Sequence, residues 1–163
     1  MKGTTENARY GNAAPRIAES AAGVLNSVGL QNPGVDAFIA EEMPFLRQYD
    51  VKIIANISGN TPEEYGLMCE KLSDAGVDLI EVNISCPNVK AGGLAYGTKP
   101  ELAAEVTEIA KKHSTVPVMV KLSPQCDGCG GDRKAVETRG RMPCLSSIPS
   151  LACASTSTPA GPF

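Results

Sequence analysis

The feature that most constrains this chain is an alternation of three short apolar runs with two helical patterns. The runs cover residues 51–55, 79–84 and 116–121 and are rich in β-branched residues. Such runs are typical of strands buried on both faces, as in parallel sheets. The order strand, helix, strand, helix, strand predicts βαβ units, and therefore an α/β fold with a parallel sheet.

Capping signals mark the two intervening helices. Thr61 to Glu64 form a capping box with Pro62 at the first helical position, and Gly76 lies where that helix should end. Its predicted core stripe consists of Tyr65, Met68, Cys69 and Leu72. The second helix is predicted to open at residues 98–101, with a buried stripe of Leu102, Val106 and Ile109 and with a solvated His113 near its end.

Each predicted strand ends in a polar residue: the first closes on Asn56, the second on Asn83 and the third on Lys121. The carboxyl ends of parallel strands meet at one edge of a sheet, where α/β folds gather their chemistry. Three polar residues in succession therefore predict a polar ligand across that edge, and Lys121 indicates that part of it is anionic. The alternative is that these side chains only cap the strand ends.

A cysteine follows Asn83 after three residues. The amides of Asn83 and Asn88 could read a planar imide or carboxylate, and the Cys86 thiol between them is a candidate base or nucleophile. By itself the segment is more typical of a turn at Pro87 with a small buried thiol. The neighbouring polar strand ends favour the functional interpretation.

Bulk properties exclude several classes of protein. The 163 residues carry a net charge of −3 without a basic stripe, which argues against a nucleic-acid binder. No apolar run approaches the roughly 20 residues that span a bilayer, and residues 1–5 lack the apolar core of a secretion signal. We therefore expect a cytoplasmic protein with reduced cysteines and no membrane contact. The glycines and asparagines of residues 26–34 predict turns with positive φ. The segment contains no G-x-G-x-x-G fingerprint of a dinucleotide-binding site.

Several motifs then occur in order along residues 2–124. They are Lys2-Gly3-Thr4-Thr5, Gly11-Asn12, Pro15-Arg16, and the segments 26–34, 54–56, 83–93 and 120–124. Together they resemble dihydroorotate dehydrogenase, in its cysteine-using class 1 and within that the NAD-linked type 1B catalytic subunit. The resemblance implies an FMN-binding TIM barrel that oxidises dihydroorotate to orotate in pyrimidine biosynthesis.

The resemblance also implies roles for individual residues. Cys86 would take a proton from C5 of the substrate while a hydride passes from C6 to flavin N5. Substrate contacts would come from Lys2, Asn26, Ser27, Val28, Gly29, Leu30, Asn83 and Asn88. FMN contacts would come from Lys2, Gly3, Asn56, Asn83 and Lys121, with no metal ligand. Implied partners are an FAD and iron–sulfur electron-transfer subunit and, in the intact enzyme, a second copy of the chain.

A complete barrel needs about 250 residues, so this chain is expected to hold about half of one and to be inactive alone. The family's first strand would lie upstream of Lys2. Residues 1–124 are predicted to form a partial FMN-binding TIM-barrel domain, and residues 125–163 an aberrant or disordered tail. A shifted reading frame in the tail permits a sequence typical of the family, so we predict a frameshift, which the nucleotide sequence would test.

Two other functions fit parts of the sequence. Another FMN barrel, such as a dihydropyrimidine dehydrogenase domain, has a similar cysteine loop, although residues 26–34 favour dihydroorotate dehydrogenase. A non-catalytic metal-binding module could use Cys126 and Cys129, which form one C-x-x-C pair.

Overall fold

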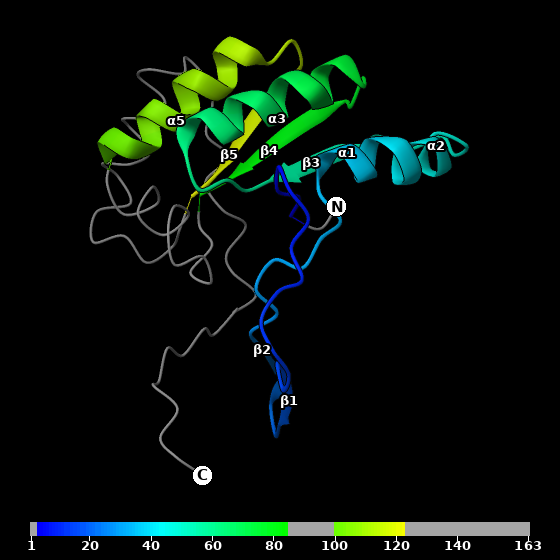
Figure 1. The fold of residues 1–163 in the computed structure, drawn as a ribbon, viewed down its shortest axis with the longest axis vertical. Coiled ribbons are helices and arrows are strands. Elements are labelled where there is room, and N and C mark those ends of the chain that lie inside the picture. The colour runs from blue at the N-terminus through cyan, green and yellow to red at the C-terminus, as the bar shows by residue number, and fades with distance from the viewer. Residues whose placement is uncertain (1–2, 85–99, 123–163) are drawn as a thin grey trace.

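The computed structural model describes residues 3–84 and 100–122, and the statements below concern these residues. The chain begins with a hairpin and a short helical segment and continues as alternating strands and helices (Figure 1). In chain order the elements are β1 (Ile17–Ser20), β2 (Gly23–Asn26), α1 (Val35–Ala37), the π-helical turn η1 (Phe38–Glu42), α2 (Met43–Leu46), β3 (Ile54–Ile57), α3 (Pro62–Asp74), β4 (Leu79–Asn83), α5 (Pro100–His113) and β5 (Val118–Lys121).

The central sheet has the order β3-β4-β5, and both strand pairs are parallel. Helices α3 and α5 connect successive strands and lie together over one side of the sheet (Figure 1). The predicted α/β class and parallel sheet are therefore confirmed. The sheet is open over the described residues, so a half TIM barrel remains a prediction.

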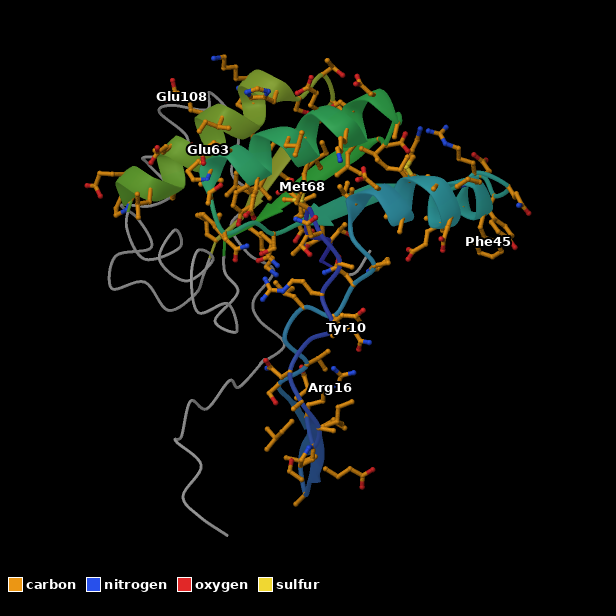
Figure 2. All side chains as sticks on the ribbon, viewed as in Figure 1. Tyr10, Arg16, Phe45, Glu63, Met68 and Glu108 are labelled. Carbon is orange, nitrogen blue, oxygen red and sulfur yellow. The ribbon has the colours of Figure 1, made fainter. Side chains whose placement is uncertain are left out.

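The hydrophobic core lies between this sheet and its two helices. Alternate strand residues such as Ala55, Ile80 and Val118 are buried against the helices. Helix α3 contributes the predicted stripe, and Met68 lies on its inner side (Figure 2). The expectation of strands buried on both faces holds only in part for the described residues, because on the opposite face Asn56 and Asn83 are buried whereas Ile54 and Lys121 are exposed.

The predicted boundaries of α3 are confirmed. Thr61 is the N-cap, and its hydroxyl accepts a hydrogen bond from the backbone N–H of Glu64 at 3.3 Å. The Glu64 carboxylate returns to the backbone N–H of Asn60 at 2.7 Å, one residue before the cap. Gly76 ends the turn after the helix with a φ of 79°, which is costly for residues with a Cβ.

Helix α5 packs on small residues rather than on the predicted stripe alone. Val106 is buried as predicted, but Leu102 and Ile109 are only half-buried. The buried residues of this helix are Ala103, Ala104, Val106, Thr107 and Ala110. A Cβ on Gly66 of α3 would lie 3.0 Å from Ile109 Cγ2, so the two helices meet too closely for larger side chains. His113 is exposed at the helix end, as predicted.

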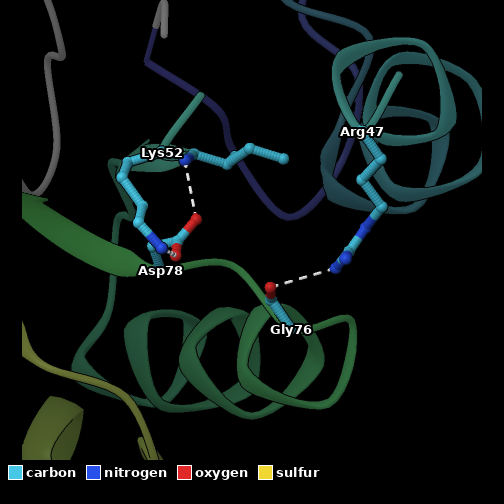
Figure 3. Close-up of polar contacts among 5 residues, drawn as sticks. Arg47, Lys52, Gly76 and Asp78 are labelled. Carbon is cyan, nitrogen blue, oxygen red and sulfur yellow. Dashed lines mark hydrogen bonds and ion pairs between the residues drawn. The ribbon is translucent and has the colours of Figure 1, made fainter. Parts of the chain in front are cut away.

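The first strand of the sheet begins later than predicted. It was expected to cover residues 51–55 and to close on Asn56, but β3 covers Ile54–Ile57 and Asn56 lies within it. The Asp78 carboxylate accepts hydrogen bonds from the backbone N–H of Ile53 at 2.8 Å and from Lys52 Nζ at 2.9 Å (Figure 3). The Asp78 carboxylate therefore satisfies the backbone N–H of Ile53, and the hydrogen-bonded strand β3 begins one residue later, at Ile54.

Two features of the first half were not predicted. Strands β1 and β2 pair antiparallel as an arm that extends away from the sheet, and Tyr10 and Arg16 lie on the segment that leads into it (Figures 1 and 2). Every residue of both strands is exposed. The helical segment from α1 to α2 was also missed, although the spacing of its buried residues Val35, Phe38 and Met43 was a usable signal.

Candidate functional site

The face of the sheet opposite α3 and α5 carries polar residues towards the carboxyl ends of its strands. Residues paired in register point to the same face, and the register pairs Asn56 with Glu81 and Asn83 with Lys121. We call these four residues the polar face. It lies opposite the side covered by α3 and α5, and its position agrees with the sequence-based expectation for Asn56, Asn83 and Lys121.

The two asparagine side chains of the polar face are buried and joined to each other. Asn56 is 8% exposed and Asn83 is 7% exposed. Asn83 Nδ2 donates to Asn56 Oδ1 at 3.5 Å, and Asn56 Nδ2 donates to Glu81 Oε1 at 2.7 Å. Burying amides of this kind costs free energy unless they are hydrogen-bonded. The two hydrogen bonds offset this cost and fix the positions of the amide groups.

Helix α3 fixes the end of β4 from the other side of the sheet. The Tyr65 ring is fully buried, and its hydroxyl donates to the backbone carbonyl oxygen of Asn83 at 3.1 Å. This bond links the core of the βαβ unit to the residue that carries the second amide. The Asn83 backbone is therefore held at the point where the chain leaves the sheet.

The N-terminal segment lies against the same site. Thr4 forms a parallel bridge with Ile57, and its N–H donates to the Asn56 carbonyl oxygen at 2.8 Å. A Cβ on Gly3 would lie 2.9 Å from Asn56 Oδ1 and 3.1 Å from Leu30 Cδ2. Gly3, Leu30 and Asn56 thus lie together although they come from three separate parts of the chain.

A hydrogen-bonded asparagine shapes the loop that carries Leu30. Asn32 Oδ1 accepts from the backbone N–H groups of Thr5 at 3.1 Å and Gly34 at 2.9 Å, and its Nδ2 donates to the Leu30 carbonyl oxygen at 2.8 Å. Leu30 has a φ of 55° and Gly29 a φ of 76°, so the positive-φ turns predicted here are confirmed. Sequence reasoning missed Asn32 as the residue that holds them.

The remaining predicted site residues fall into two groups. Asn26 and Ser27 are exposed and belong to the hairpin arm, where Asn26 pairs with Ile17 and the Ser27 N–H donates to the Arg16 carbonyl oxygen. Val28 is half-buried and Gly29 is buried where the arm joins the loop. Lys2, Cys86 and Asn88 lie outside the described residues, so their roles remain predictions.

Cys69 confirms the prediction of a core cysteine. It is fully buried on α3, and burial raises the pKa of its thiol to about 12. A thiol with this pKa stays protonated near neutral pH, which excludes it as a nucleophile or base.

Within residues 3–84 and 100–122 no three His, Cys, Asp or Glu side chains are grouped to hold a metal ion. The pair Cys126 and Cys129 lies outside these ranges. No helix in the same ranges is both long and apolar enough to cross a bilayer.

The fold and the polar face define a βα-repeat protein with polar side chains gathered on one face of its parallel sheet. The family model described as dihydroorotate dehydrogenase matches residues 1–151. The chain therefore belongs to the dihydroorotate dehydrogenase family. The match runs past Pro124, where the motif-based resemblance ended, and the proposed frameshift in the tail remains a prediction.

Curated relatives agree on one subtype. Over 141 residues the chain is 55% identical to the dihydroorotate dehydrogenase B (NAD(+)) catalytic subunit of Anoxybacillus flavithermus and 52% identical to that of Geobacillus kaustophilus, covering 86% of this chain and 45% of each relative. It is 57% identical over 124 residues to that of Alkaliphilus metalliredigens, covering 76% of this chain and 41% of the relative. The chain thus spans less than half the length of these relatives. These matches give no support to a metal-binding module or a dihydropyrimidine dehydrogenase domain.

Proposed function

We propose that this chain is part of a cytoplasmic catalytic subunit that oxidises dihydroorotate to orotate in pyrimidine biosynthesis, with FMN as its cofactor. The observation that carries the proposal is the convergence of Gly3, Leu30, Asn56 and Asn83 from separate segments onto one site. Family membership and the names of the relatives supply the reaction.

The described residues fit a flavin. Asn56 and Asn83 offer buried amide groups that both donate and accept, which suits the alternating donors and acceptors of a flavin ring. Gly3 lets backbone approach this site with no side chain in between. Lys121, next to Asn83 in register, brings a positive charge to the same face. When bound, FMN supplies the acceptor for the hydride that leaves the substrate.

The protein's own part in the reaction is to hold the substrate and remove a proton. We assign proton removal to the Cys86 thiolate and substrate contacts to Lys2, residues 26–30, Asn83 and Asn88. An unperturbed cysteine has a pKa near 8.5, so proton removal by Cys86 should become faster as the pH rises towards that value. The positive charge of Lys121 would stabilise negative charge that develops at the cofactor.

Electrons would leave through a second protein. The relatives are named catalytic subunits that use NAD(+), which supports a separate electron-transfer subunit. By the family resemblance we propose that this partner carries FAD and an iron–sulfur cluster. A second copy of the catalytic chain is part of the same proposal.

Orotate binding tests this function without requiring turnover. The full chain is loaded with FMN, and orotate is added while the visible flavin spectrum is recorded. We expect a saturable spectral shift with orotate and none with uracil at the same concentration. A shift with uracil but not with orotate would favour a dihydropyrimidine dehydrogenase domain, and no shift with either would contradict the proposed substrate.

A further inference from the structure

We propose that Glu81 is a positioning residue that fixes which way the Asn56 side-chain amide faces. In this arrangement Asn56 presents its carbonyl oxygen, rather than its NH2 group, beside Gly3. The part of the inference that concerns FMN rests on the proposed function, whereas the part that concerns the amide does not.

The hydrogen bond between the Asn56 and Glu81 side chains can form in only one direction, with the amide as donor. Asn56 and Glu81 are register partners on β3 and β4, and Asn56 Nδ2 donates to Glu81 Oε1 at 2.7 Å. An ionised carboxylate can only accept hydrogen bonds. Turning the amide over would bring two acceptor oxygens together, so the charge-assisted bond selects one orientation.

The other end of the amide faces the site. Asn56 Oδ1 lies 2.9 Å from the position of a Cβ on Gly3 and accepts from Asn83 Nδ2 at 3.5 Å. Asn56 is 8% exposed, and hydrogen bonds in such surroundings are stronger than in water. Because the bond to Glu81 keeps the NH2 group away from Gly3, a ligand that meets Asn56 beside Gly3 meets the oxygen and must offer an N–H or O–H donor.

The identity of residue 81 is otherwise hard to explain. It is the one charged residue among the apolar and amide residues of β4, and its register partner on β5 is Met119. A half-buried carboxylate between an amide and a thioether gains little from packing and loses hydration. The hydrogen bond to Asn56 accounts for a carboxylate at this position, where a neutral amide would leave Asn56 free to turn.

The first test observes the amide itself and needs no cofactor. The full chain is labelled with ¹⁵N, and the Asn56 NH2 resonances are assigned from their loss in Asn56→Ala. Glu81→Gln should shift these resonances, Glu81→Asp should keep them near their wild-type positions, and Glu105→Gln, a matched change at an exposed site on α5, should leave them unchanged. Unchanged Asn56 resonances in folded Glu81→Gln would overturn the inference.

The second test measures the consequence for the cofactor by FMN fluorescence titration. Glu81→Gln should raise the Kd for FMN about tenfold, in the range for a hydrogen bond to a charged group. Glu81→Asp should recover part of the affinity, and Glu105→Gln should match the wild type. In an Asn56→Ala background Glu81→Gln should have no further effect, because its action passes through Asn56.

These readouts separate the two proposals. Equal FMN affinity in the wild type and Glu81→Gln, or a full tenfold loss that persists in the Asn56→Ala background, would overturn the positioning role while leaving FMN binding established. If the wild type binds no FMN, the Asn56 resonances still decide whether Glu81 orients the amide. Far-UV circular dichroism of each variant verifies that it is folded.

Discussion

Alkaline pH should destabilise this protein through the buried thiol of Cys69. The thiol is fully buried on α3, and burial raises its pKa from an ordinary value of 9.0 to about 12 in the folded state. Above pH 9 the unfolded chain releases this proton while the folded chain keeps it. The contribution to stability is therefore complete below pH 9 and is lost as the pH rises towards 12.

The size of the effect follows from the two pKa values. They differ by about three units, and each unit corresponds to about 1.4 kcal/mol. The loss therefore reaches about 4 kcal/mol at its upper limit and about 2 kcal/mol at pH 10.5. Since small domains are stable by only about 5–15 kcal/mol, a loss of this size is easily measured.

Urea unfolding at pH 8 and at pH 10.5 tests this prediction. Other groups also titrate in this range, so the comparison is made with Cys69→Ala, which retains them all. Cys69→Ala should be less stable than the wild type at pH 8, because it leaves a small cavity. The free-energy difference between the two proteins should shrink by about 2 kcal/mol at pH 10.5. A difference that stays constant with pH would refute the link between burial and titration at Cys69.

Three further substitutions test the capping, the loop and the close approach at the site. Thr61→Ala should lower the free energy of unfolding by about 1 kcal/mol because the Glu64 N–H loses its cap, and an unchanged urea midpoint would exclude this cap. Asn32→Asp should lower it by about 1–3 kcal/mol, since an acceptor would then face the Leu30 carbonyl oxygen; thermal unfolding at wild-type temperature would contradict that role. Gly3→Ala should cost about 1–3 kcal/mol because the new methyl group meets Asn56 Oδ1 at 2.9 Å, and wild-type stability in urea would show that the segment can move aside.

Local signals in the sequence predicted the βαβ region well. Thr61, Pro62 and Gly76 act through chain geometry within a few residues, so their roles could be read directly. The start of β3 could not, because it depends on a hydrogen bond from the Ile53 N–H to the carboxylate of Asp78, 25 residues away. A hydrogen bond between residues this far apart cannot be predicted from the local pattern of apolar and polar residues.

The site was predicted in part for the same reason. Asn56, Asn83 and Lys121 follow from strand ends, and the structure places them on one face. The roles of Asn32 and Glu81 depend on partners that only the folded chain brings near. The hairpin arm was missed because its short strands are exposed on both faces and so lack a buried stripe.

FMN binding by the full chain tests the central claim most directly. We expect the wild type and Asn7→Ala, which changes an exposed asparagine, to bind one FMN per chain with equal affinity. Asn56→Ala should bind at least about tenfold more weakly, because it removes a buried amide from the polar face. Equal affinity in all three proteins would contradict the assignment of the polar face as the flavin site.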